Sequence, residues 1–434
     1  MEKERLKRFI NEVQNSSVKK NFPFMPPPKE KASIVAWIQS YFNERDERIT
    51  LSDAKEIADY LIGLGPMQQF YENPRISEVI AQNGIIRVEE EGIIKNTGIQ
   101  IDDETAERIL RNLAIATGTK FGTARPLLST QIPNSFDRVL GMIPPITIHP
   151  QINIRKHMET AYSIADLIDK KMLSIEMADF LEEMIKIKTN ILITGIGSAG
   201  KTTLADALLQ LVPEDSIVAV VEDVRELHPK KVNFTSMVAL HRKSSSEEEP
   251  EEVVDVATLI NMVGTRIHAN RVILGEIRTG DEANQFLNTI GIGSDGVITT
   301  IHSSTPKGAV ERLETLSLSA MKNFSEQALK ERIGSNLDVI VQLAMIRDRF
   351  RIVERIDFLY LNENRDYAFT PVYKTVIKKV EEDSIDIAFK SLFNIGLLPE
   401  KIVNRFERYY GNKWKEKSPF VKAKLDEEKE VLIE

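Results

Sequence analysis

The stretch from Gly195 to Thr203, Gly-Ile-Gly-Ser-Ala-Gly-Lys-Thr-Thr, has the residue types and spacing of a phosphate-binding loop. It fits the pattern G-x-x-x-x-G-K-[ST], in which backbone N–H groups and the start of the following helix bind phosphate oxygens. Lys201 would neutralise the terminal phosphates of a polyphosphate, and the Thr202 hydroxyl would hold Mg²⁺. The predicted phosphate-binding residues are Gly195, Gly197, Ser198, Ala199, Gly200, Lys201, Thr202 and Thr203.

Two further apolar runs each end in a carboxylate. Residues 216–221 are followed by Glu222 and soon after by Glu226, and residues 271–275 are followed by Glu276. Ligands of parallel α/β sheets bind at the carboxyl ends of the strands, so these acids are placed to reach Mg²⁺ or an attacking water. Glu276 is expected to orient or deprotonate that water, and Glu222 is the second predicted catalytic carboxylate.

His302 ends another apolar run, residues 297–301. A histidine at the end of a strand is often a structural hydrogen-bonding residue, but a neutral imidazole here would also contact the γ-phosphate or its water. We therefore expect Lys201, Glu276 and His302 to lie on the same side of the sheet, with His302 as a third catalytic residue. The predicted metal-binding residues are Thr202, Glu226 and Glu276.

The elements that must position these residues alternate along the chain. Residues 190–194 are apolar and β-branched, which predicts a strand, and residues 203–211 carry apolar side chains at helical spacing. Residues 158–186 are expected to be helical. Alternation of strand and helix indicates an α/β fold with a parallel sheet covered by helices.

The composition excludes several classes of protein. At 434 residues the chain is too long for one core, so two or three domains are expected. Without cysteine there is no disulfide, thiolate nucleophile or Cys-ligated zinc. The net charge of −8 weighs against general nucleic-acid binding. The charged start and the lack of a long apolar run predict a cytoplasmic protein.

Four motifs in order resemble the ATPase superfamily of type II and type IV secretion. They are the phosphate loop, Val221–Leu227, Arg271–Arg278 and Val297–His302. The segments Gly63-Leu-Gly-Pro66 and Asn153-Ile-Arg-Lys156 are similar to the branch that serves tight-adherence pili and conjugative or type IV secretion. The resemblance covers about residues 60–360 and departs from the family pattern at Ser198-Ala199, where Gly-Ser is usual.

The resemblance implies a fold, ligands and partners. It implies an α+β N-terminal domain before a RecA-like P-loop domain, with ATP and Mg²⁺ bound near the hinge between them. It also implies a homohexamer that docks on an inner-membrane platform protein, is peripheral to that membrane and needs no nucleic acid. Arg138 and Arg155 match arginines with which the N-terminal domain contacts the phosphates. The alternative is that they lie on a solvated face or form ion pairs. Three more arginines match family positions, and which of them point into the site stays open. They are Arg242, Arg266 and Arg271.

The expected domains are an N-terminal extension with a Pro-rich linker at 1–48, an α+β domain at 49–157, a RecA-like ATPase domain at 158–365 and a helical C-terminal extension at 366–434. The C-terminal extension would pack on the ATPase core or bind a platform protein. The leading hypothesis is an ATP-hydrolysing hexameric motor for pilus assembly, protein secretion or conjugation. The alternatives are a nucleic-acid translocase on the same core, and a weakly hydrolysing scaffold or regulator.

Overall fold

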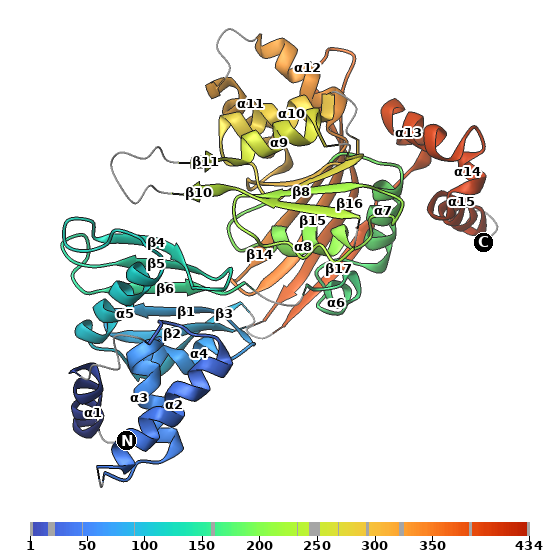
Figure 1. Cartoon of the computed structure of the whole chain (residues 1–434). Helices are drawn as coiled ribbons and strands as arrows, with labels where there is room; N and C mark the ends of the chain where they lie inside the picture. The colour runs from blue at the N-terminus through green and yellow to red at the C-terminus, as the bar shows by residue number, and fades with distance from the viewer. Residues whose placement is uncertain are drawn as a thin grey trace. The chain divides into compact units, whose positions relative to one another are not determined.

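The computed structural model divides into two compact units, one up to Glu159 and the other from Thr160 onward (Figure 1). It describes residues 3–15, 22–45, 47–90, 92–157, 161–231, 233–242, 252–267, 269–291, 295–320, 325–381 and 384–431.

Three helices at the start of the first unit share one apolar core. They are α1 (Lys3–Asn15), α2 (Pro28–Asn43) and α3 (Leu51–Ile62). Phe9, Phe42 and Ile57 are fully buried in this core. A proline at the first helical position suits α2, because its missing N–H would have no helical partner there. The chain therefore does not divide near residue 48, since helices before and after that point pack together.

The rest of the first unit is an antiparallel sheet in the order β3-β2-β1-β6-β5-β4. Its core also takes in residues of α5 (Asp103–Ala116), and η2 (Gly65–Met67) and α4 (Gln68–Tyr71) link α3 to the sheet. Its strands are β1 (Ile76–Gln82), β2 (Ile85–Glu90), β3 (Ile93–Gln100), β4 (Leu127–Gln131), β5 (Arg138–Met142) and β6 (Gln151–Arg155).

The second unit is built on a nine-stranded sheet in the order β17-β16-β15-β14-β7-β13-β12-β8-β9. The six strands from β14 to β9 are parallel, and β14 to β17 pair antiparallel. The α/β class is confirmed, although the sheet is mixed rather than parallel throughout. The strands are β7 (Ile191–Gly195), β8 (Val218–Glu222), β9 (Phe234–Val238), β12 (Arg271–Leu274), β13 (Ile298–His302), β14 (Val339–Ile346), β15 (Phe350–Leu361), β16 (Tyr367–Val380) and β17 (Ile385–Ser391); β10 (Leu240–Arg242) and β11 (Glu252–Val254) form a separate pair.

Helices cover both faces of this sheet (Figure 1). Successive residues of a strand point to opposite faces, so Ile191 and Ile193 of β7 pack into one core and Leu192 into the other. The first core includes α6 (Ile164–Asp169), α7 (Ile175–Lys186), α8 (Lys201–Leu209), α13 (Glu400–Tyr410), α14 (Trp414–Lys417) and α15 (Pro419–Val431). The second includes α9 (Val256–Thr265), α10 (Gly280–Gly291), α11 (Pro306–Ala320) and α12 (Glu326–Asn336).

The expectation of a helical extension at 366–434 is wrong for the first part of that range. Residues 367–391 form β16 and β17, and helices resume after the short η3 (Ile395–Leu397). The apolar residues Ile385, Ile387 and Phe389 recur every second position, which is the period of a strand rather than of a helix. Pairing with β16 gives their backbone N–H and carbonyl groups hydrogen-bond partners and extends the sheet.

A buried ion cluster fixes α13 to the sheet. The Asp338 carboxylate is fully buried just before β14 and accepts a hydrogen bond of 2.8 Å from the backbone N–H of Asn190. Arg405 of α13 lies 2.8 Å from the same oxygen, and Lys401 lies 3.4 Å from the other. The C-terminal helices therefore pack on the core of their own unit.

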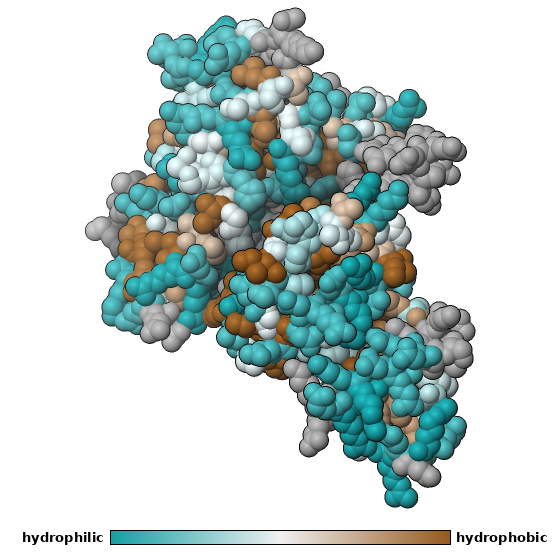
Figure 2. Space-filling model, turned by 90° about the vertical axis from the view of Figure 1, so that its left-hand side faces the viewer, coloured by the Kyte–Doolittle hydropathy of each residue, from teal (hydrophilic) through white to brown (hydrophobic). Residues whose placement is uncertain are grey.

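None of the described helices is both long enough and apolar enough to cross a bilayer. In the space-filling view, hydrophilic residues cover most of the visible face and hydrophobic residues gather in separate groups (Figure 2).

Candidate functional site

The predicted phosphate loop joins β7, a strand buried at every position, to the N-terminus of α8. Gly200 is the N-cap of α8 with φ of +91°, in the left-handed region that glycine tolerates best. Ser198 also has a positive φ, +59°. A side chain at Gly195 would lie 3.0 Å from the Leu343 carbonyl oxygen, whereas one at Gly197 would meet nothing within 4 Å. The loop is therefore shaped by close packing at its ends and open at Gly197.

Lys201 folds back over this loop. Its Nζ donates to the carbonyl oxygens of Gly195 and Ile196 at 3.1 and 3.0 Å, and lies 3.0 Å from Nδ1 of His302. Burial lowers the pKa of Lys201 to about 8, against the opposing effect of the Glu276 carboxylate. The ammonium group thus sits beside the loop carbonyls, where a phosphate oxygen is its natural competitor.

His302 connects Lys201 to Glu276. Nδ1 of His302 accepts from the lysine ammonium, and Nε2 lies 2.9 Å from Oε1 of Glu276. Burial and the Lys201 charge lower the pKa of His302, which keeps the imidazole neutral with its proton on Nε2. The predicted proximity of these three side chains is confirmed. It arises because β7, β12 and β13 are parallel, so their carboxyl ends meet at one edge of the sheet.

Arg278 holds the other side of Glu276. Its Nε lies 2.9 Å from Oε2 of Glu276, and its NH1 lies 3.0 Å from Oδ2 of Asp223. Both oxygens of Glu276 therefore have partners, one neutral and one cationic. The carboxylate is held in one orientation by His302 at the end of β13 and by Arg278 from its own segment after β12.

Glu222 organises the segment after β8. Its Oε1 accepts from the backbone N–H groups of Glu226 and Leu227 at 2.8 and 2.9 Å. Its Oε2 is buried without a hydrogen-bond partner among the described residues. Burial raises the pKa of Glu222 to about 7. One oxygen of Glu222 thus positions the backbone, and the other has no hydrogen-bond partner within the described part of the chain.

Arg351 belongs to the loop, although no sequence motif pointed to it. Its Nε donates to the Ser198 carbonyl oxygen at 2.8 Å. Arg347 and Asp348, both with positive φ, form the tight turn between β14 and β15. Because β14 runs parallel to β7, this turn and Arg351 return to the edge where the loop lies. The resemblance over residues 60–360 includes position 351, but none of the four motifs that carry it contains this arginine.

The comparisons with known proteins agree with this geometry. The family model described as "Type II/IV secretion system protein" matches residues 87–362, more than half of the chain. The chain belongs to this family. The resemblance drawn from the sequence is thereby confirmed, and the protein is an ATPase of the type IV secretion and conjugation class.

Two curated relatives and one solved structure illustrate the match. The conjugal transfer protein TrbB of Rhizobium radiobacter is 31% identical over 242 residues, covering 55% of this chain and 69% of its own. The type IV secretion system protein VirB11 of Bartonella henselae is 24% identical over 348 residues, 70% of this chain and 94% of its own. The Legionella pneumophila ATPase DotB aligns with 69% of this chain and 80% of its own, at 17% identity and a TM-score of 0.48.

The arginines of this secretion ATPase divide into separate groups. Arg271, only 2% exposed, donates to Ser216 Oγ and to the Ile185 carbonyl oxygen at 2.9 and 2.6 Å, so it ties α7 to the start of β12 and has a structural role. In the first unit, Arg138 and Arg155 lie opposite each other on β5 and β6. Arg155 lies 3.8 Å from Glu78 on its other side. Arg266 is exposed, and the side chain of Arg242 lies outside the described residues.

Among the described residues, no group of three or more His, Asp or Glu side chains is arranged to hold a metal by itself.

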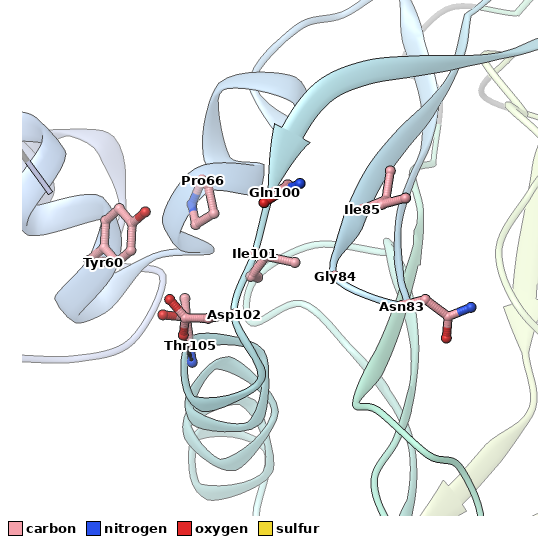
Figure 3. A pocket seen from close by; sticks show the side chains of 9 residues that line it. All are labelled: Tyr60, Pro66, Asn83, Gly84, Ile85, Gln100, Ile101, Asp102 and Thr105. Carbon is pink, nitrogen blue, oxygen red and sulfur yellow. Dashed lines mark hydrogen bonds between the residues drawn. The ribbon is translucent and has the colours of Figure 1, made fainter.

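A hollow of about 330 Å³ lies in the first unit and includes none of the predicted site residues. Its residues come from α3, η2, the β1–β2 turn, the end of β3 and the start of α5 (Figure 3). They are Tyr60, Pro66, Asn83, Gly84, Ile85, Gln100, Ile101, Asp102 and Thr105.

Proposed function

We propose that this chain is the subunit of a homohexameric ring motor that hydrolyses ATP at the cytoplasmic face of the inner membrane. Its work would be type IV secretion or conjugative transfer, with a membrane platform protein as partner and without an obligate nucleic acid. The observation that carries the proposal is the line of contacts from Lys201 through His302 to Glu276. Such a line brings a phosphate-neutralising cation and a carboxylate base to one phosphoryl group.

In this proposal the part up to about residue 157 is the N-terminal domain, and residues 158–365 are a RecA-like core. The phosphate loop and the N-terminus of α8 bind the triphosphate, and Lys201 moves from its carbonyl partners to the phosphate oxygens. Arg138 and Arg155 contribute positive charge from the N-terminal domain. They are directly opposite each other on neighbouring strands, which concentrates positive charge at one place on the sheet.

The residues present fit Mg²⁺ and a triphosphate. The oxygens of Thr202, Glu226 and Glu276 are hard ligands of the kind that Mg²⁺ prefers, and the buried Oε2 of Glu222 lacks a partner among the described residues. Mg²⁺, when bound, would draw negative charge from the transferring phosphoryl group. Glu276 would orient and deprotonate the attacking water, and neutral His302 would donate to the phosphate or to that water.

Two variants test the proposal. Lys201→Ala should abolish ATP hydrolysis and weaken nucleotide binding, with the melting temperature largely unchanged. Glu276→Gln should reduce hydrolysis by about 10²-fold or more while nucleotide binding persists, because only the base is lost. Hydrolysis at the normal rate in Lys201→Ala would remove the claim. Glu311→Gln, an exposed position on α11, is the matched control.

A further inference from the structure

A groove of about 1100 Å³ lies between α7 and α15 in the second unit. It contains no residue of the phosphate site, and α15 lies beyond the segment that matches the family model. One side is a single face of α7 that carries Glu176, Asp179, Glu183 and Lys186. The other side is formed by α15 and by the residues that follow β17.

The floor of the groove is apolar and rigid. Phe420, 8% exposed, packs edge-to-face against Phe180 and Phe393, with ring centroids 5.7 and 5.1 Å apart. Ala423 is exposed in the groove, and Ile175 stands at its margin with 65% of its surface exposed. An apolar side chain from another molecule therefore has a preformed surface to contact.

The walls carry more acids than bases. Five carboxylates, of Glu176, Asp179, Glu182, Glu183 and Glu427, stand against the two lysines Lys186 and Lys424. Among the described residues, no cation lies within ion-pair distance of Asp179. The groove therefore favours a positively charged occupant and repels a phosphate backbone.

The lysines show how the groove holds ammonium groups. Lys424 of α15 contacts Glu176 across the groove and lies 2.9 Å from Glu427. Lys186 lies 2.8 Å from Glu182 on α7. Carboxylates in both walls are thus within reach of a cation that enters between the helices.

We propose that this groove docks a basic amphipathic helix of a partner protein. The lysines or arginines of that helix would pair with Asp179 and its neighbours, and an apolar side chain would cover Phe420 and Ala423. A groove between two helices suits a third helix, as in other helix-in-groove complexes. The 12 residues of α7 span about 18 Å, which sets the length of the docked segment at about 12 residues. This docking site goes beyond the nucleotide chemistry and does not depend on it.

The test uses the full chain and a fluorescein-labelled amphipathic peptide of leucine and lysine, about 14 residues long, in about 0.15 M salt. Fluorescence anisotropy should show saturable binding, and a leucine–glutamate peptide of the same pattern should not bind. Asp179→Lys should weaken binding about tenfold, because it places a like charge in the groove. Glu363→Lys, with the same change of charge in the exposed β15–β16 turn, should alter the affinity less than about twofold.

A second variant tests the apolar floor. Ala423→Trp should fill the groove and weaken binding about tenfold, with an unchanged melting temperature as evidence of folding. Equal weakening by Asp179→Lys and Glu363→Lys, or no effect of Ala423→Trp, would overturn the proposal. Binding that appears only after removal of residues 428–434 would make the chain's own end the occupant and would also overturn it. ATP hydrolysis should be unaffected by these variants, so failure here and failure of the motor proposal are separate results.

Discussion

At the phosphate loop, three side chains from separate strand ends share their polar atoms in a fixed sequence of donors and acceptors. Lys201 donates to His302, His302 donates to Glu276, and Glu276 also faces Arg278. This order places the imidazole proton on Nε2, because a neutral imidazole has one donor and one acceptor nitrogen.

Glu222 gives a pH-dependent prediction. Its pKa in the folded chain is about 7, above its ordinary value of 4.5, because of burial. Between pH 4.5 and 7 the folded chain holds a proton that the unfolded chain has lost, so the free energy of unfolding falls as pH rises through this window. Glu222→Gln does not titrate. The free energy of unfolding of Glu222→Gln, relative to that of the unsubstituted chain, should therefore rise by about 2–3 kcal/mol between pH 5 and pH 8.

Urea unfolding of both proteins at pH 5, 6, 7 and 8 measures this difference. Glu363→Gln, at an exposed turn position, should show no such trend. A stability difference for Glu222→Gln that does not change with pH would contradict the prediction.

At the scale of elements, the loop depends on the turn between β14 and β15 as much as on its own sequence. Arg351→Met keeps much of the aliphatic stem but removes the hydrogen bond to the Ser198 carbonyl oxygen. One such bond is worth about 1 kcal/mol, so the KM for ATP should rise about fivefold while kcat changes less. Steady-state hydrolysis measures both constants. Arg365→Met, on the exposed β15–β16 turn, is the control, and an unchanged KM in Arg351→Met would contradict the assigned role.

Gly200 and Gly197 of the phosphate loop allow a steric test in which one substitution serves as the control for the other. Gly200→Ala places a side chain at a φ of +91°, with its Cβ 3.3 Å from Met172 Cε, and should lower the free energy of unfolding by about 1–2 kcal/mol. Gly197→Ala meets nothing within 4 Å and should change it by less than about 0.5 kcal/mol. Chemical denaturation of the two variants tests the pair, and equal losses would refute the steric explanation.

At the scale of the whole chain, Asp338 joins segments that are far apart in the sequence. Arg405→Met removes one of the two cations that offset the buried negative charge of Asp338. It should lower the free energy of unfolding by about 3 kcal/mol. Adding Asp338→Asn should restore part of that loss, because the unpaired charge is removed. Denaturant unfolding measures both variants. Arg408→Met, exposed on the same helix, should be near neutral, and an equal effect of the two arginine variants would argue against the ion cluster.

Much of the candidate site follows from local sequence. The glycines and Lys201 lie within one loop, and parallel strands bring Glu276 and His302 to the same edge. The contribution of Arg351 was not predictable, since it depends on the return of β15 more than 150 positions along the chain. The strands at 367–391 were not predicted, although Ile385, Ile387 and Phe389 recur with the period of two that is typical of a strand. The packing of α1 and α2 with α3 required tertiary contacts that no single helix reveals.

The two loop carbonyl oxygens that accept from Lys201 Nζ use the same donor that a phosphate oxygen would need. Any incoming phosphate has to displace these oxygens, which reduces its net affinity. In the proposed motor the same oxygens would accept from the ammonium group again after product release, so the lysine charge would have hydrogen-bond partners at both stages of the cycle.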